Sequence, residues 1–159
     1  MSTETIVKPI FGMFTIERKL KHKPERVFRA FEDPAAHHRW FVSGEGWEIA
    51  NYIHDFRTGG HEYGQFRPIG HPSMFSNDSW YLEIVKGQRI AVAYTMGVDG
   101  KPISHSLAVT EFFPDGPSGC RLVYAEQGAY YGSEDEIRNR KAGCTELFGK
   151  LEDELNTHN

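Results

Sequence analysis

No apolar run in the sequence approaches the roughly 20 residues that a membrane-spanning helix needs. Basic blocks are absent as well, because 18 lysines and arginines stand against 22 aspartates and glutamates, a formal net charge of -4 at pH 7. We therefore expect neither a membrane nor a nucleic acid as a partner. Residues 1–9 contain one lysine, Lys8, and no apolar segment of the kind found in secretory signals, which favours a cytoplasmic location.

Motifs for the commonest kinds of catalysis are missing too. The two cysteines, Cys120 and Cys144, do not have the spacing of a metal or redox site, and we expect reduced, buried thiols. No Gly-x-Ser-x-Gly nucleophile motif occurs, and Gly44-Glu45-Gly46 lacks the third glycine of a phosphate-binding loop. No cofactor is expected, no catalytic residue is assigned, and whether the protein is an enzyme stays open.

Histidines are frequent, with eight in the chain, but their spacing is not that of a metal site. His37 and His38 are adjacent, so their side chains diverge on a helix, and no His-Glu-x-x-His motif is present. His54, His61 and His105 fall on separate predicted strands, which a sheet can bring together. Histidines on the surface or at a pocket rim are the commoner case, and no metal site is predicted.

The length and composition describe one ordinary globular domain. A chain of 159 residues is long enough to form a hydrophobic core, and 25% charged residues are typical of soluble proteins. No linker, repeat or low-complexity segment divides the chain. We therefore expect an N-terminal tail over residues 1–12 and a single domain over residues 13–156.

The pattern of apolar residues predicts a strand, two short helices and then a β meander. Residues 13–20 form the first strand, and a helix begins at Pro24, whose missing N–H costs nothing at the first helical position. Val27, Phe28 and Phe31 share one face of this helix, which ends at Asp33-Pro34 before a short helical segment over residues 35–40. The predicted strands of the meander cover residues 47–57, 61–67, 90–96, 104–113 and 120–127, and a further strand within residues 74–85 is clearest at 80–85.

A long amphipathic helix over residues 133–155 follows the last strand. Ser133 and Glu136 have the spacing of a capping box. An apolar stripe at helical spacing faces the core, formed by Ile137, Cys144, Leu147, Phe148, Leu151 and Leu155. The opposite face is expected to carry the polar residues Arg138, Arg140, Lys141, Glu146, Lys150, Glu152 and Asp153.

This order of elements is that of the helix-grip fold. The chain resembles the SRPBCC (START-like) superfamily, in the branch of proteins like the activator of heat-shock-protein ATPase. The resemblance covers about residues 13 to 155 and is carried, in this order, by Pro24-Glu25-Arg26-Val27-Phe28, Asp33-Pro34, Arg39-Trp40-Phe41, Asp55-Phe56-Arg57 with Gly59-Gly60, Arg89-Ile90 with Tyr94, Ser106-Leu107-Ala108-Val109-Thr110-Glu111-Phe112 and Glu126-Gln127-Gly128-Ala129. It implies an α+β fold in which a curved antiparallel sheet of about six to seven strands wraps around the C-terminal helix.

The resemblance also implies a pocket. Proteins of this fold include lipid carriers, hormone receptors, polyketide cyclases and co-chaperone domains. We expect a small hydrophobic or aromatic ligand in an internal cavity between the sheet and the C-terminal helix. An enzyme of the polyketide cyclase or hydrolase type using the same pocket, and a chaperone-regulating interaction module, are the alternatives; an exposed edge strand would allow a homodimer. Many members of the branch carry a Gly-Trp pair in the last helix, where this chain has Gly143-Cys144, and the smaller side chain predicts a larger pocket.

The residues expected to line the cavity are mostly aromatic, because aromatic and thioether side chains give a large apolar contact with few rotamers to freeze. The branch's pattern places a pocket aromatic on residues 90–96, which points to Tyr94 and Met96. Neighbouring strands and the helix add Tyr63, Trp80, Leu82, His105, Leu107, Tyr124 and Phe148. Tyr94, His105 and Tyr124 are expected to orient the ligand by hydrogen bonds.

Two groups of charged residues also fall on the predicted strands. Glu126 would be a general base if burial raised its pKa, but an exposed or cross-strand-paired carboxylate is the expectation. Asp55 and Arg57 are expected to pair at a strand end.

Overall fold

The structure, a computed structural model, describes residues 6–158. The first half contains a strand, three short helical segments and two further strands: β1 (Pro9–Leu20), α1 (Pro24–Glu32), α2 (Pro34–His37), η1 (His38–Val42), β2 (Trp47–His54) and β3 (His61–Pro68). The second half contains four strands and the long helix: β4 (Phe75–Val85), β5 (Arg89–Val98), β6 (Lys101–Asp115), β7 (Gly119–Tyr131) and α3 (Asp135–Thr157).

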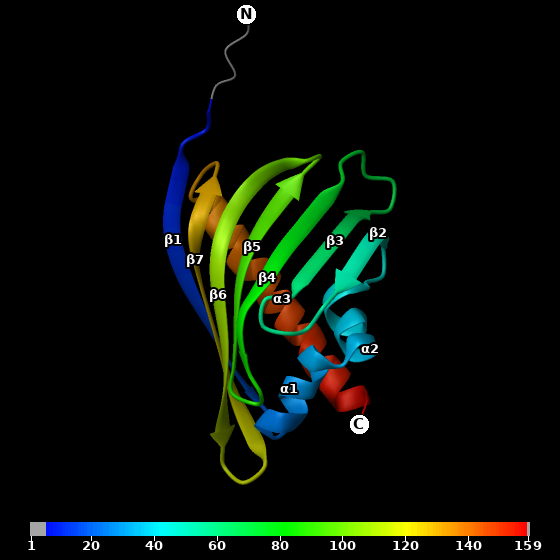
Figure 1. The fold of residues 1–159 in the computed structure, drawn as a ribbon, viewed down its shortest axis with the longest axis vertical. Coiled ribbons are helices and arrows are strands. Elements are labelled where there is room, and N and C mark those ends of the chain that lie inside the picture. Colours follow the sequence, from blue (N-terminus) through cyan, green and yellow to red (C-terminus); the bar gives the residue numbers. More distant parts are fainter. Residues whose placement is uncertain (1–5, 159) are drawn as a thin grey trace, which may run out of the picture.

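The strands form one seven-stranded antiparallel sheet in the order β1-β7-β6-β5-β4-β3-β2. Figure 1 shows the sheet curving and all helices lying on one side of it, with α3 crossing that side on a diagonal. The predicted helix-grip architecture is therefore confirmed. The first strand begins at Pro9, earlier than residue 13, because Pro9 to Met13 continue the pairing with β7.

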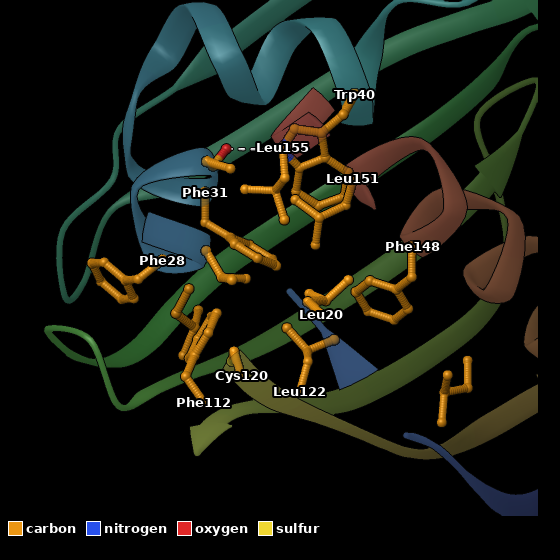
Figure 2. Close-up of a cluster of buried hydrophobic side chains, with 14 of the residues drawn as sticks. Leu20, Phe28, Phe31, Trp40, Phe112, Cys120, Leu122, Phe148, Leu151 and Leu155 are labelled. Carbon is orange, nitrogen blue, oxygen red and sulfur yellow. Dashed lines mark hydrogen bonds between the residues drawn. The ribbon is translucent and has the colours of Figure 1, made fainter. Parts of the chain in front are cut away.

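The hydrophobic core lies where α1 and α3 meet the sheet (Figure 2). Pro24 starts α1, whose buried face packs Phe28 and Phe31 edge-on against Phe112 of β6, at ring-centroid distances of 5.5 and 5.3 Å. Trp40 donates its indole N–H to the Ala30 carbonyl at 2.8 Å, which ties η1 to α1. Two short helices are thereby fixed against the sheet without needing stability of their own.

Helix α3 contributes its C-terminal half to the same core. Phe148, Leu151 and Leu155 are buried, as the apolar stripe predicts. The predicted capping box does not form: the Ser133 hydroxyl accepts from the backbone N–H of Asp135 at 3.2 Å, and the helix begins at Asp135. Arg140 departs from the prediction as well, because it faces the sheet instead of solvent.

The pleat of the sheet decides which residues face the helices. On β6 the alternate residues Ser104, Ser106, Ala108, Thr110 and Phe112 are buried beneath the helices. The register carries this face across the sheet, since Ser106 is opposite Tyr94, Tyr94 is opposite Ser79, and Ser79 is opposite Glu62. We call this helix side the inner face and the other side the outer face.

Candidate functional site

The inner face holds two buried polar clusters, and the first surrounds Glu126 of β7. Glu126 is completely buried, and one of its carboxylate oxygens accepts hydrogen bonds from the hydroxyls of Tyr94 and Tyr124, the latter at 2.6 Å. The other oxygen accepts from Ser106 at 3.0 Å and Tyr130 at 2.7 Å. An exposed carboxylate is therefore ruled out, whereas the alternative of cross-strand partners is found, because Ser106 and Tyr94 donate to Glu126 from other strands. Four hydroxyls in all replace the water that Glu126 loses on burial.

Arg140 of α3 completes this Glu126 cluster. One guanidinium nitrogen lies 3.4 Å from the Glu126 carboxylate and donates to the Tyr94 oxygen at 2.9 Å, while the other donates to Ser104 at 2.7 Å. Burial would lower the pKa of Arg140, but Tyr94 and Glu126 raise it above its ordinary value. Burial raises the pKa of Tyr94 well above its ordinary value, against the influence of Arg140, so Tyr94 remains a hydrogen-bond donor at neutral pH.

The second cluster surrounds Glu62, at the start of β3. His37 of α2 lies with its Nε2 2.7 Å from a Glu62 oxygen that also accepts from the Tyr52 hydroxyl at 2.5 Å. Tyr81 donates to the other oxygen at 3.1 Å and lies 3.2 Å from Nε2 of His54 at the end of β2. The rings of His37 and His54 stack with centroids 4.6 Å apart. This Glu62 cluster therefore joins three strands and the α2 helix around one buried carboxylate.

Electrostatics in the Glu62 cluster favour a charged Glu62 carboxylate beside a neutral His54 ring and two protonated phenols. Burial alone would raise the pKa of Glu62, but His37 and the hydrogen bonds from His37 and Tyr52 hold it below its ordinary value. Burial lowers the pKa of His54, although Glu62 opposes this effect. Burial and the nearby Glu62 charge raise the pKa of Tyr52 and Tyr81, so both phenols stay protonated.

Beyond these clusters, one part of the inner face is apolar and not covered by the core. The register places Met96, Phe75 and Phe66 on the inner face, and each is partly exposed. In the described part of the chain, neither the core nor the hydrophobic side chains packed against it include these three residues. Figure 1 shows no helix behind the ends of β3 and β4 that meet in their connecting loop. We call Met96, Phe75 and Phe66 the apolar strip.

The predicted pocket residues divide between the two faces. Tyr94, Met96, Tyr124 and Phe148 lie on the inner face or on α3 opposite it, and Tyr124 contacts Phe148 at a ring-centroid distance of 5.2 Å. The other predicted residues lie on the outer face, where they cannot line a space beneath α3: Tyr63, Trp80, Leu82, His105 and Leu107. The predicted position in a cavity beneath α3 is therefore wrong for these five residues. Strand alternation directs four of them to the outer face, and Leu82 is exposed at a β-bulge in β4.

The predicted histidine positions also change. His54 faces inward, whereas His61 stacks on Trp80 and pairs with Asp78 at 2.5 Å on the outer face. His105 lies on the outer face too, so the three strand histidines do not converge. His37, expected at the surface or a pocket rim, is buried in the Glu62 cluster. The expected ion pair of Asp55 with Arg57 forms at 2.8 Å in an exposed position.

Sequence reasoning missed several residues of the two clusters. Their common feature is a polar side chain at an inward position, and they are His37, Tyr52, Glu62, Tyr81, Ser104, Ser106, Tyr130 and Arg140. Arg140 had a usable signal, because it follows Ile137 by three residues and precedes Cys144 by four, which places it within the apolar stripe.

Two hollows on the surface of residues 6–158 stand out, and neither of these two lies between the sheet and α3. An open groove of about 710 Å³ lies over β1, β7 and β6, between Phe11, Met13 and Leu107 on the outer face. A second hollow of about 350 Å³ lies between α1 and the end of α3, beside Arg29, Arg39 and Glu154. Beneath α3 itself, the inner face is occupied by the core and the Glu126 cluster.

The family model described as "Activator of Hsp90 ATPase homolog 1-like protein" matches residues 21–156. The chain belongs to this family. A crystal structure of a protein from Rhizobium loti is 38% identical over 92% of this chain and 98% of its own, with a TM-score of 0.83. A protein of Rhizobium leguminosarum described as putative and uncharacterized is 31% identical over 97% and 100% of the two chains, with a TM-score of 0.88.

More distant relatives share the fold. A protein from Chromobacterium violaceum is 24% identical over 92% of this chain, with a TM-score of 0.75. No curated protein is similar enough to match the chain. Among the described helices, none is long and apolar enough to cross a membrane. The family is thus established, and the inner face holds the residues most informative about function.

Proposed function

We propose that this protein binds a small, largely apolar molecule on the inner face of its sheet. The observation that carries the proposal is the apolar strip of Met96, Phe75 and Phe66, which is partly exposed beside the buried Glu126 cluster. Binding sites for small molecules combine an apolar lining with a few fixed polar groups. The helix-grip fold of the family is consistent with such a role.

The polar end of the ligand is expected to meet Tyr94 and Arg140. Tyr94 and Met96 are two residues apart on β5, so they share the inner face about 7 Å from each other. The carboxylate of Glu126 already accepts four hydroxyl hydrogen bonds, and its charge balances that of Arg140. A neutral hydrogen-bonding group, such as a carbonyl or a phenol, therefore suits this end better than a second charge.

The apolar end of the ligand is expected to lie on the strip. The rings of Phe66 and Phe75 stack with centroids 6.3 Å apart, and Trp47 adds a further ring beside Phe66 at 5.7 Å. Met96 adds a flexible thioether, which adapts to ligands of different shape. An aromatic or short aliphatic group would bury these side chains and so gain the free energy that the core gains elsewhere.

Native mass spectrometry of the protein purified from its own host, with organic extraction of any bound molecule, tests the proposal. We expect a stoichiometric small molecule that is lost in Met96→Trp, where the larger side chain fills the strip, and weakened in Tyr94→Phe. Leu107→Trp on the outer face is the matched control and should retain it.

Two results would overturn the proposal. One is a protein that carries no molecule and whose melting temperature does not change with any compound of a broad hydrophobic library. The other is a bound molecule that Met96→Trp retains and Leu107→Trp loses, which would place the site on the outer face. Turnover of a bound molecule would instead add an enzymatic step to the binding proposed here.

A further inference from the structure

Over residues 6–158, the buried side-chain nitrogens and oxygens without a hydrogen-bond partner are two: Nδ1 of His37 and Nδ1 of His54. Both belong to the Glu62 cluster. A buried polar atom without a partner is destabilising, and in native proteins it commonly marks a catalytic group or the place of a water molecule or an ion. The Glu126 cluster shows no such atom, so the Glu62 cluster is the incomplete one.

The residues of the Glu62 cluster also have the chemistry of a metal site. One ring nitrogen of His37, one of His54 and one carboxylate oxygen of Glu62 lie within 4.8 Å of one another. Two imidazoles and a carboxylate are the protein ligands of many zinc sites that keep a fourth position open. We propose that His37, His54 and Glu62 bind a divalent transition-metal ion, with Zn²⁺ as the best-suited ion.

The three ligands come from well-anchored parts of the fold. His37 is buried between Trp40 and Phe41, with ring-centroid distances of 5.3 and 4.7 Å. Glu62 lies on β3 directly opposite His54 in the β2 register. A site built on a strand pair and a packed helix holds its ligands more accurately than one built on a loop.

Binding requires a small rearrangement of the cluster. Zinc–ligand bonds of about 2.0–2.1 Å in a tetrahedron place neighbouring ligand atoms about 3.4 Å apart. Nε2 of His37, and not its unpartnered Nδ1, is the nitrogen that lies 2.7 Å from the Glu62 oxygen, so the ion replaces the proton between these two atoms and separates them slightly. The two histidine rings are nearly parallel, at 16°, so His54 turns about its Cβ–Cγ bond to bring the ion into its ring plane. His54 is the less buried of the two and sits at a strand end, where this turn meets less resistance.

Tyr52 and Tyr81 support the ligands. Each donates to a Glu62 oxygen, and Tyr81 lies within hydrogen-bond distance of His54. Partners of this kind orient metal ligands, and their loss typically weakens metal binding about 10–100-fold. A water molecule or one of the phenol oxygens would fill the fourth position.

The test is isothermal titration of tag-free, chelator-treated protein with Zn²⁺. We expect one ion per chain with a dissociation constant in the micromolar range or tighter, and visible absorption bands of tetrahedral Co²⁺ when cobalt replaces zinc. His54→Gln and Glu62→Gln should weaken binding at least about tenfold, as the loss of a direct ligand exceeds that of a supporting residue. His61→Gln is the matched control, because His61 also pairs with a carboxylate but lies on the outer face.

The outcomes separate cleanly. If the wild-type protein does not bind Zn²⁺ stoichiometrically, the proposal is overturned. This outcome needs no variant, so the test remains decisive even if Glu62→Gln misfolds. Equal affinity in wild type and His54→Gln, or loss of binding in His61→Gln, would place the ion elsewhere and also overturn it. Near-ultraviolet circular dichroism of each variant shows whether its fold is retained. A rise in the melting temperature with Zn²⁺ that is lost in His54→Gln supports the proposal, since an ion that binds the folded state stabilises it.

Discussion

Replacing Glu126 by glutamine should strongly destabilise the protein, although the two side chains have nearly the same shape. Glu126 is fully buried, and its partner Arg140 has a side chain that is only 16% exposed. Glutamine removes the charge that balances Arg140, and its amide group points N–H donors at hydroxyls that are themselves donors. Breaking a buried ion pair by removing one partner costs about 3–5 kcal/mol.

The effect is large enough for ordinary urea denaturation. With a slope of about 2 kcal/mol per molar urea for a chain of this size, a loss of about 4 kcal/mol lowers the unfolding midpoint by about 2 M. Arg138→Met is the control on the same helix, because Arg138 pairs with Asp135 in an exposed position. An exposed pair contributes at most about 1 kcal/mol, so its midpoint should move far less.

A double-mutant cycle makes the reasoning refutable. If Glu126 and Arg140 act as a pair, the double variant Glu126→Gln/Arg140→Met should be more stable than the sum of the two single effects predicts, by at least about 1 kcal/mol. A Glu126→Gln variant within about 1 kcal/mol of the wild type, or two effects that simply add, would show that the Glu126–Arg140 pair does not stabilise the fold.

Further predictions concern the core, the thiols and the turns. Leu151→Ala should lower the free energy of unfolding by about 2–5 kcal/mol, because Leu151 is fully buried. In the same urea titration Leu82→Ala, at an exposed position, should change it by less than about 0.5 kcal/mol. Equal effects of the two variants would contradict the core shown in Figure 2. Burial raises the pKa of Cys120 to about 11 and that of Cys144 to about 12. At pH 8 both thiols should therefore react with iodoacetamide far more slowly in the folded protein than in the urea-unfolded protein, and equal rates would refute this prediction. Both folded-state pKa values lie above the unfolded value of about 9, so the stability that the two buried thiols contribute is present below pH 9. This stability should fall as the pH rises from 9 towards 11, and thermal melts across this range would detect the fall. Gly60→Ala should destabilise the protein by more than about 1 kcal/mol, because a Cβ would collide with the Asp55 carbonyl. Gly143→Ala, in open space on α3, should stabilise the protein by about 0.5–1 kcal/mol. Thermal melts that rank the two variants the other way would contradict this prediction.

The sequence pattern predicted the elements well because each has a strong local signal. Pro24 and the Val27, Phe28 and Phe31 face define α1, and the spacing from Phe148 to Leu155 defines the buried face of α3. The family resemblance then implied that the strands form one curved antiparallel sheet around the C-terminal helix, which the structure confirms. These signals depend only on residues close together in the chain, so they can be recognised from the sequence alone.

The site was harder to predict because it depends on which face each strand turns inward. In the strand from Ser104 to Phe112 the polarity of a residue does not indicate its burial. Ser104 and Ser106 are buried although they are polar, and Leu107 is exposed although it is apolar. His105 and Leu107, expected to line the pocket, therefore lie on the outer face. The reason is physical: buried serines on β6 are satisfied by Glu126 and Arg140, which are distant in sequence.

The two inner-face clusters differ in a way that predicts different responses to substitution. In the Glu126 cluster each carboxylate oxygen accepts two hydroxyl hydrogen bonds, so any change there removes a satisfied contact and should lower stability. The Glu62 cluster contains two buried nitrogens without hydrogen-bond partners, and each of them lowers the stability of the folded state. Residues kept in such an arrangement commonly serve function over stability. We therefore expect His54→Phe, which removes one unpartnered nitrogen and keeps a ring against His37, to leave the melting temperature unchanged or raised in metal-free protein. A fall comparable to that of Glu126→Gln would show that the Glu62 cluster is a stabilising network like its neighbour.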